Sequence, residues 1–511
     1  MPPQIPGNFT AAAHDLRTWH PYIVVKLALT LALILLAPAI HATPWLEPGD
    51  VRARHSVQWL ADRGCLNIPA NTWPIMWADL SRALNHDAPD HCRDSLAWRY
   101  LRFERDYHMT DQPRISLRAA GASREPWLRD FDDAPREKAE IGARLEMKTD
   151  HLAFGLAPTY VRDPRDGDRL RFDGSYLAGT AGNWVLGAGA IDRWWGPGWH
   201  SAALLSSNAR PVPGVWLNRR RSDAPEWIGL RWLGPWNFVA FAGQLESDRF
   251  ISEAKLIGAR FSFRPWQHLE IGLMRTFLWG GEGQSESWSS LRNCTLGQSN
   301  VYGDTENPCD QIAGGDFRLS LPVGDNTVGF YGEVIGEDEA GFLPSQLFGT
   351  FGVDAASRLA GGEQRFFVEF TDTVAGVFSS EERLSAYEHS TFRTGNRYKG
   401  RTTGSTWESN SRVVSLGANQ FFRNGSDISV TYSRAELNRV DTLRSRPPEA
   451  GVPVFDVSFA QDVDIYALRY RRPVLGGRLT LSGYHTSKEI ETEARIWSRT
   501  TAMAAWEFRF D

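Results

Sequence analysis

The sequence contains no apolar run long enough to cross a membrane as a helix. Its most apolar stretch, residues 27–36, follows Lys26, whereas a spanning helix needs about 20 apolar residues. A basic residue, a short apolar core and the small Ala42 after it are typical of a signal peptide cleaved near that position. The sequence therefore predicts that residues 1–42 are a signal peptide and that the mature chain is exported.

The sequence also lacks an excess of positive charge and any complete catalytic motif. It has 56 Lys and Arg against 61 Asp and Glu, so it offers no strongly basic surface for nucleic acid. It contains no H-E-x-x-H, no G-x-S-x-G and no phosphate-binding glycine loop. We predict a non-enzymatic protein without catalytic residues, cofactor or metal. An outer-membrane hydrolase stays an alternative, because its catalytic groups would come from separate strands.

Cysteine is scarce, with four residues in 511. An even number of cysteines in an exported chain favours disulfides over metal ligation or catalysis. The natural pairs are neighbours in sequence, Cys65 with Cys92 and Cys294 with Cys309, and neither pair has the spacing of a metal site. Two disulfides are predicted, the second of them in a polar loop.

The 21 Trp and 46 Gly accompany a mean hydropathy of -0.37, which is too polar for a helical membrane protein and suits a β-barrel. After Pro113 apolar and polar residues alternate, as in residues 257–264, and the pattern continues to the aromatic end at Phe510. Turns such as Asn424-Gly425 are short, whereas residues 279–312 and 373–412 form long polar loops. This asymmetry predicts an outer-membrane antiparallel β-barrel over residues 113–511, with about 16 to 20 strands.

Residues 43–112 have helical spacing instead. Asp50 can cap a first helix that Gly64 ends, and a second helix follows Trp73-Pro74. A third is predicted from about Arg93, with a buried stripe at Leu96, Tyr100, Phe103 and Tyr107. These helices predict a small α-helical bundle on the periplasmic side of the barrel.

Two segments carry a family resemblance. Residues 192–198, DRWWGPG, and residues 204–211, LLSSNARP, resemble the signature of the Wzi family of capsule assembly proteins. Residues 216–219, WLNR, and residues 394–401, TGNRYKGR, are also similar to that family, as is Trp73-Pro74. The resemblance implies a barrel of about 18 strands with a periplasmic helical bundle. It also implies a lectin-like role in anchoring capsular or related exopolysaccharide at the cell surface.

Sugar recognition uses aromatic faces against the ring and Arg, Asn, Asp or Glu against hydroxyls and carboxylates. One predicted loop region concentrates such side chains. The polysaccharide-binding candidates are Tyr387, His389, Arg393, Arg397, Tyr398, Lys399, Arg401 and Trp407. Barrels also place aromatics in interface girdles and cations in the lumen, so for any single residue a structural role is the more frequent one.

The signature segments suggest a plug inside the barrel, where arginines could pair with carboxylates such as Asp192 and Asp223. The lumen or plug candidates are Asp192, Arg193, Trp194, Trp195, Asn208, Arg210, Asn218 and Arg219. A channel for sugars or other small solutes is the main alternative function, and it predicts an open lumen.

The expected partners are the polysaccharide, outer-membrane lipid and lipopolysaccharide. The bundle could also contact polysaccharide export machinery, through Trp45 and Trp73 if both are exposed. A monomer is expected, because a closed barrel leaves no strand edge to pair.

Overall fold

The computed structural model describes residues 45–85, 88–110, 112–149, 151–297, 309–340, 343–375, 386–439, 457–492 and 495–510. The predicted signal peptide and its cleavage site lie outside these residues. None of the described helices is both long and apolar enough to cross a membrane.

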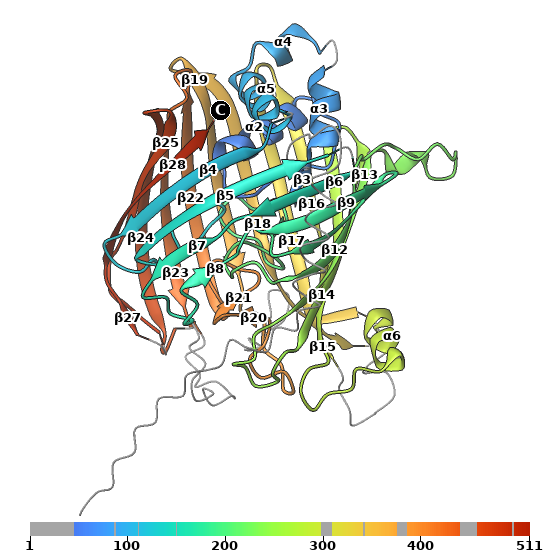
Figure 1. The fold of residues 1–511 in the computed structure, drawn as a ribbon, viewed down its shortest axis with the longest axis vertical. Helices are drawn as coiled ribbons and strands as arrows, with labels where there is room; N and C mark the ends of the chain where they lie inside the picture. The colour runs from blue at the N-terminus through green and yellow to red at the C-terminus, as the bar shows by residue number, and fades with distance from the viewer. Residues whose placement is uncertain are drawn as a thin grey trace, which may run out of the picture.

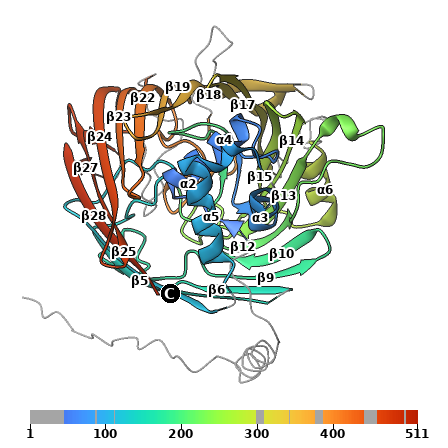
Figure 2. The same ribbon diagram turned by 90° about the horizontal axis from the view of Figure 1, so that it is seen from above.

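The described strands form one closed antiparallel barrel around the N-terminal helices (Figures 1 and 2). The wall consists of β4 (Arg114–Ala122), β5 (Ala139–Lys148), β6 (Leu152–Leu156), β7 (Thr159–Arg162), β8 (Leu170–Arg171), β9 (Tyr176–Ala181), β10 (Trp184–Gly189), β12 (Gly214–Arg219), β13 (Trp236–Gln244), β14 (Lys255–Trp266), β15 (Leu269–Trp279), β16 (Cys309–Val323), β17 (Asn326–Ala340), β18 (Leu343–Leu359), β19 (Gly362–Asp372), β22 (Ser411–Phe422), β23 (Asp427–Leu437), β24 (Gln461–Val474), β25 (Gly477–Thr486) and β28 (Thr500–Phe510). β6 and β7 both pair with β5, so they are two halves of one interrupted strand, as are β8 and β9 opposite them. Counted this way, the described wall has 18 strands, which confirms the predicted barrel.

The remaining elements are short. The helices are α2 (Val51–Asp62), α3 (Trp77–Asn85), α4 (Asp90–Arg93), α5 (Leu96–His108), η1 (Arg231–Leu233) and α6 (Trp288–Leu296). The two-residue strands outside the wall are β1 (Trp45–Leu46), β2 (Thr72–Trp73), β3 (Ile75–Met76), β11 (Trp194–Trp195), β20 (Arg397–Tyr398), β21 (Arg401–Thr402), β26 (Ile490–Glu491) and β27 (Ile496–Trp497).

The alternating pattern separates the two faces of the wall. On β14, Arg260 and Ser262 are buried inside the ring. On the outer face, apolar side chains such as Leu273, Val368 and Leu468 are exposed by half or more. Because a strand turns successive side chains to opposite faces, this sequence gives an apolar exterior suited to lipid and a polar interior.

The two ends of the barrel differ in their connections. Hairpin turns such as 324–325 and 475–476 lie at the end that carries the N-terminal helices, which we call the short-turn end. The connections after β15 and β19 lie at the opposite end, the long-loop end (Figure 1). Short turns face the periplasm in bacterial outer-membrane barrels, which is why the helices are expected on that side.

The helices lie within the barrel mouth rather than apart from it. Seen from above, α2 and α5 occupy the interior of the ring (Figure 2). The Asp50 carboxylate accepts hydrogen bonds from the backbone of Arg52 at 2.8 Å and of Ala53 at 3.1 Å, as the predicted cap requires. Because α2 is enclosed by the wall, Arg52 to Asp62 are all buried, and not only its apolar stripe.

Two expectations for this region are wrong. α5 buries the face with Ala97, Trp98, Leu101 and Glu104, while Phe103 of the predicted stripe is 63% exposed. The burial is displaced because Glu104 must reach the wall, where it binds Arg509 of β28 at 3.1 Å.

Trp45 and Trp73, expected to be exposed, are also buried. Trp45 packs against Tyr176 and Trp216 of the wall, and Trp73 packs within the bundle against Phe131. The proposed contact with export machinery through these two residues therefore loses its basis.

The barrel closes by pairing β28 with β4, from Phe510 opposite Ile115 to Met503 opposite Ala122. β4 follows α5 directly along the chain. The first and last wall strands are therefore both attached to the helical region, one through the chain and one through Arg509.

Candidate functional site

Residues 190–213 leave the wall between β10 and β12 and fold into the barrel. Inward carboxylates of the wall hold their backbone. Glu369 of β19 accepts hydrogen bonds from the amides of Trp199, His200 and Ser201, the last at 2.8 Å. Glu333 of β17 accepts from Ala203 at 2.8 Å and Leu204 at 3.2 Å. These bonds satisfy backbone donors that would otherwise be buried without partners.

The tryptophans of the DRWWGPG segment are structural. Trp194 and Trp195 form β11, which pairs with β2 of the helical region, and both are fully buried. The guanidinium of Arg54 from α2 lies 5.1 Å from the ring centre of Trp194. Arg193 lies 4.7 Å from the ring centre of Phe241 on the wall. This segment thus joins the helical region to the wall inside the barrel.

A second segment, residues 386–410, folds in from the long-loop end and packs on the first. Asn208 donates through its Nδ2 to the carbonyl oxygens of Thr402 and Ser405 at 3.1 Å. Its Oδ1 accepts from Arg401 at 3.1 Å. A Cβ at Gly404 would lie 2.2 Å from the Ala203 carbonyl oxygen, so the two backbones meet where a larger residue would not fit.

The structure buries several of the residues predicted to contact polysaccharide. Tyr387, Arg397 and Trp407 are each 1% exposed or less. The Tyr387 amide donates to Glu337 of the wall at 2.9 Å, and Arg397 donates to Glu388 at 2.7 Å. Trp407 packs against His200 and Trp127. His389 accepts backbone hydrogen bonds from Thr391 and Phe392, and Arg393 is exposed over Phe250.

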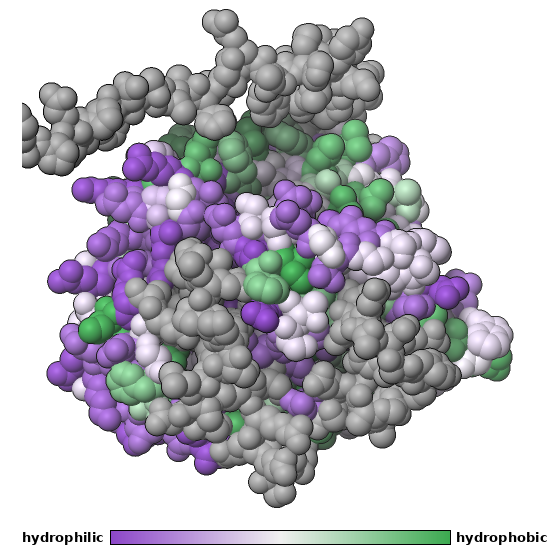
Figure 3. Space-filling view, turned by 90° about the horizontal axis from the view of Figure 1, so that it is seen from below, coloured by the Kyte–Doolittle hydropathy of each residue, from purple (hydrophilic) through white to green (hydrophobic). Residues whose placement is uncertain are grey.

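Tyr398, Lys399 and Arg401 instead line a cavity of about 310 Å³ at the long-loop end. We call it the outer cavity. Its lining includes seven cationic and five acidic side chains, so its walls carry a positive balance. These charged residues are Arg129, Arg136, Arg165, Arg171, Arg210, Lys399, Arg401, Glu125, Glu137, Asp166, Glu246 and Asp248. Seen from the long-loop end, the described surface is mixed in character, with many hydrophilic side chains (Figure 3).

Arg129 stands out among these cations. It donates to the carbonyl oxygens of Ala134 and Ser207, at 3.1 and 3.4 Å, and forms no ion pair with any described carboxylate. Burial lowers the pKa of Arg129 to about 9, and the neighbouring Arg136 and Arg401 act in the same direction. The side chain therefore stays positively charged at neutral pH, next to the space of the cavity.

The other arginines of the cavity are paired. Arg210 binds Asp166 and Asp168 of the 163–169 loop and Asp173, the last at 2.8 Å. Lys399 binds Asp168 at 3.1 Å. Arg210 thus pairs with carboxylates other than Asp192 and Asp223.

Three of the predicted plug residues, Asp192, Asn218 and Arg219, do not line the outer cavity. Burial raises the pKa of Asp192, whose carboxylate binds Arg136 at 3.3 Å, an interaction that opposes the shift. Asn218 is buried on β12, while Arg219 lies at the short-turn end with its guanidinium 3.5 Å from the ring centre of Trp236.

A second cavity of about 290 Å³ opens between the helical region and β4, β5 and β28. We call it the inner cavity. Arg136 and Arg171 line both cavities. Arg136 donates to the Asn208 and Ser207 carbonyl oxygens at 3.2 Å, and Arg171 binds Glu137 at 2.8 Å and Asp166 at 2.9 Å. The two side chains form a partition, which counts against an open channel through the described lumen.

Sequence reasoning missed the wall carboxylates and Arg129, Arg136 and Arg171. The signal was available for the carboxylates: Glu333, Glu337 and Glu369 occupy inward positions of alternating strands, where an unpaired acid would be costly.

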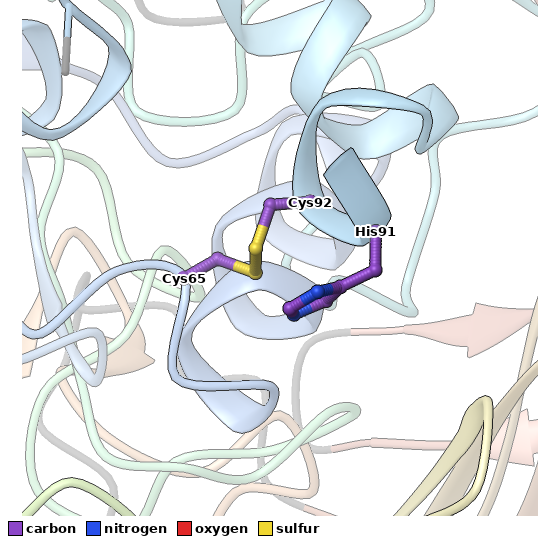
Figure 4. Close-up of side chains that lie close together, drawn as sticks. All are labelled: Cys65, His91 and Cys92. Carbon is purple, nitrogen blue, oxygen red and sulfur yellow. A yellow bond between two sulfur atoms is a disulfide. The ribbon is translucent and has the colours of Figure 1, made fainter. Parts of the chain in front are cut away.

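Both predicted disulfides are confirmed, Cys65 with Cys92 and Cys294 with Cys309. Among the described residues, only Cys65, His91 and Cys92 bring three potential metal ligands together (Figure 4). The two sulfur atoms are bonded to each other, so neither is available as a thiolate ligand.

A hydrolase would require a hydroxyl or acid nucleophile beside a histidine at the loop rim. His200 Nδ1 lies 3.6 Å from Asp130, but His200 is only 1% exposed. No described hydroxyl forms a hydrogen bond with its Nε2. The described residues therefore contain no accessible triad around His200.

Comparison with known proteins identifies the family. The family model described as capsule assembly protein Wzi matches residues 108–495. The chain belongs to the Wzi family. A Klebsiella pneumoniae relative, an uncharacterized 55.8 kDa protein in the cps region, is 30% identical over 358 residues, covering 68% of this chain and 69% of that protein.

The solved structure of Escherichia coli Wzi has the same fold. It matches with a TM-score of 0.78 at 24% identity, covering 91% of this chain and all of that one, and its description names an outer-membrane, carbohydrate-binding β-barrel involved in group 1 capsule assembly. The Wzi family is one of capsule assembly proteins rather than of enzymes. With its apolar outer face, this member is a barrel of the outer membrane.

Proposed function

We propose that the protein binds an acidic capsular or related exopolysaccharide at the outer cavity and thereby anchors it at the cell surface. The observation that carries this proposal is the positive cavity at the long-loop end, where Arg129 has no carboxylate partner among the described residues. The carbohydrate binding and capsule role described for the Escherichia coli relative support it.

The lining of the cavity suits a uronic acid unit. Arg129 can donate to a sugar carboxylate, and a charge-assisted hydrogen bond of this kind is stronger than a neutral one. Tyr398 presents an aromatic side chain, and Lys399 lies at the partly exposed side of the cavity. A cavity of this size holds about one or two sugar units, so firm attachment requires repeated contacts along the polymer.

The fold supports a proposal for the remaining partners. The apolar outer face contacts membrane lipid, and the long-loop end is inferred to face the outer leaflet and its lipopolysaccharide. The helical region is accordingly inferred to face the periplasm. A monomer is proposed, because the wall closes on itself through β28 and β4.

The decisive experiment compares cell-attached with shed polysaccharide in a strain lacking the gene, at unchanged total synthesis. Loss of the protein should reduce attached polymer and increase shed polymer. Complementation with Lys399→Gln or Arg129→Gln should restore barrel assembly but not full attachment. Arg397 and Trp407 are not chosen for substitution, because neither lines the outer cavity.

Arg434→Gln provides the matched control. Arg434 is a half-exposed cation of β23, paired with Asp464 at 2.8 Å, and it does not line the outer cavity. The Arg434→Gln variant should leave the amount of cell-attached polysaccharide unchanged. If Lys399→Gln and Arg129→Gln attach as much polymer as this control, the outer cavity is not the binding site.

A further inference from the structure

One connection at the short-turn end differs from the rest. Turns such as 324–325, 360–361 and 475–476 contain two residues each, whereas β12 and β13 are joined by residues 220–235. We call this segment the lateral extension. It projects sideways from the wall in the side view and away from the ring in the view from above (Figures 1 and 2). It therefore covers neither the lumen nor the helical region.

The lateral extension exposes apolar side chains at its tip. Trp227 is 66% exposed, Ile228 80% and Trp232 60%. Three cations, Arg220, Arg221 and Arg231, are exposed in the same segment. Large exposed apolar groups bordered by positive charge mark an interaction surface rather than a solvated turn.

The base of the lateral extension is fixed. The Ser222 amide donates to Asp79 of α3 at 2.9 Å, and Asp223 forms an ion pair with Arg82 of the same helix. The Asn183 side chain bonds the backbone of Arg221 at 2.8 and 2.9 Å. These contacts hold the segment in its sideways direction, so its exposed tip is not the result of a loose loop.

The lateral extension continues an aromatic strip on the outer face of the wall. Trp232 packs edge-on against Phe263 of β14, which in turn lies beside Phe261 and Trp236. Arg219 lies over the ring of Trp236. Outward side chains at this level face the membrane, and Trp with Arg is the combination found where acyl chains meet headgroups.

We propose that residues 220–235 are a lipid anchor that lies in the phospholipid headgroup region at the short-turn end. Trp227, Ile228 and Trp232 enter the outer part of the acyl region, and the arginines contact phosphate groups. The continuity with the lipid-facing strip favours lipid over a protein partner. This inference is independent of polysaccharide binding.

The test places a fluorescent label at Ile228→Cys in the full-length protein, reconstituted in vesicles of phosphatidylethanolamine and phosphatidylglycerol. The described cysteines are all in disulfides, so the label is directed to the new thiol. Leu475→Cys is the matched control, because Leu475 is 85% exposed in a short turn at the same end.

A nitroxide near the headgroup end of the lipid should quench the label at 228 at least about twofold more strongly than the label at 475. Aqueous iodide should quench the label at 475 more strongly than the label at 228. If iodide reaches both labels equally, the anchor does not exist, and the exposed tip would be a surface for a protein. In a parallel variant, Trp227→Ser with Trp232→Ser should return the label at 228 to iodide access while the barrel remains folded.

Discussion

At the short-turn end the lumen is filled by helices, whereas at the long-loop end it is filled by segments with little regular structure. Both fillings are held by carboxylates that point inward from the wall. Glu363 accepts hydrogen bonds from the first amides of α5, at 2.7 Å from Leu96 and 3.0 Å from Ala97. Glu369 binds the amides of residues 199–201 in the same way.

The difference lies in what else supports each end. α2 and α5 satisfy most of their own backbone groups and are linked to each other through a disulfide-bonded region. Residues 199–204 depend on Glu333 and Glu369 for their backbone bonds. A barrel wall can therefore order a segment without regular secondary structure if its inward carboxylates accept hydrogen bonds from the backbone amides of that segment.

The largest expected effect is a loss of stability at the long-loop end. Glu369→Ala leaves three buried amides without an acceptor, which costs on the order of 4 kcal/mol. Hydrogen exchange of residues 199–204 should accelerate, while that of residues 51–62 should not. Glu363→Ala is the mirror control. It should affect the start of α5 and, through the loss of His55 as a partner at 3.4 Å, α2, but not residues 199–204. Equal changes at both ends in either variant would show that the two fillings are one cooperative unit.

The next effect concerns the helical end. Replacing Cys65 and Cys92 by Ser removes a crosslink across 27 residues, a loss of about 3.5 kcal/mol in the chain-entropy account. Exchange of residues 51–62 should accelerate and exchange of residues 199–204 should stay as it was. Replacing Cys294 and Cys309 by Ser is the control, and should alter neither segment.

A third prediction is that the stability of the helical end depends on pH. Burial lowers the pKa of His55 in α2 from 6.5 to about 4. Below pH 6.5 the unfolded region takes up a proton that the folded one excludes, so stability falls as the pH drops toward 4, by at most about 3 kcal/mol. Arg365 donates to Nδ1 of His55 at 3.3 Å, which requires the neutral ring.

The measurement is exchange of residues 51–62 at several pH values, corrected for the intrinsic effect of pH on exchange. His55→Gln keeps a neutral polar side chain and should flatten the pH dependence. A variant that retains the same dependence would assign it to another group.

The expected effect on stability at the partition between the cavities is of similar size. Arg136→Ala with Arg171→Ala leaves the buried Glu137 without its arginine, which costs on the order of 3 kcal/mol, and should join the inner and outer cavities. Conductance in a planar bilayer should therefore rise above that of the unaltered protein. Arg144→Ala enlarges the inner cavity alone and should leave conductance unchanged. If the double variant conducts no better than this control, the seal lies elsewhere.

The barrel and the disulfides could be predicted because their signals are local. Alternation in residues 257–264 follows from one wall with lipid outside and polar groups inside. The place of Tyr387 could not be predicted, since it depends on Glu337, 50 positions earlier. Arg397 and Trp407 looked like exposed loop residues for the same reason. The exposure of Trp45 was misjudged because its partners, Tyr176 and Trp216, belong to distant strands.

The contact between Glu104 and Arg509 bears on how the molecule is assembled. β4 emerges from α5, and β28 must align beside β4 before the ring is complete. Arg509 of β28 reaches Glu104 only when that alignment is in register, with Arg509 opposite Ser116. The same residue that is in register on the last strand therefore also holds α5 against the wall. A last strand that joined out of register would separate Arg509 from Glu104 and lose this ion pair.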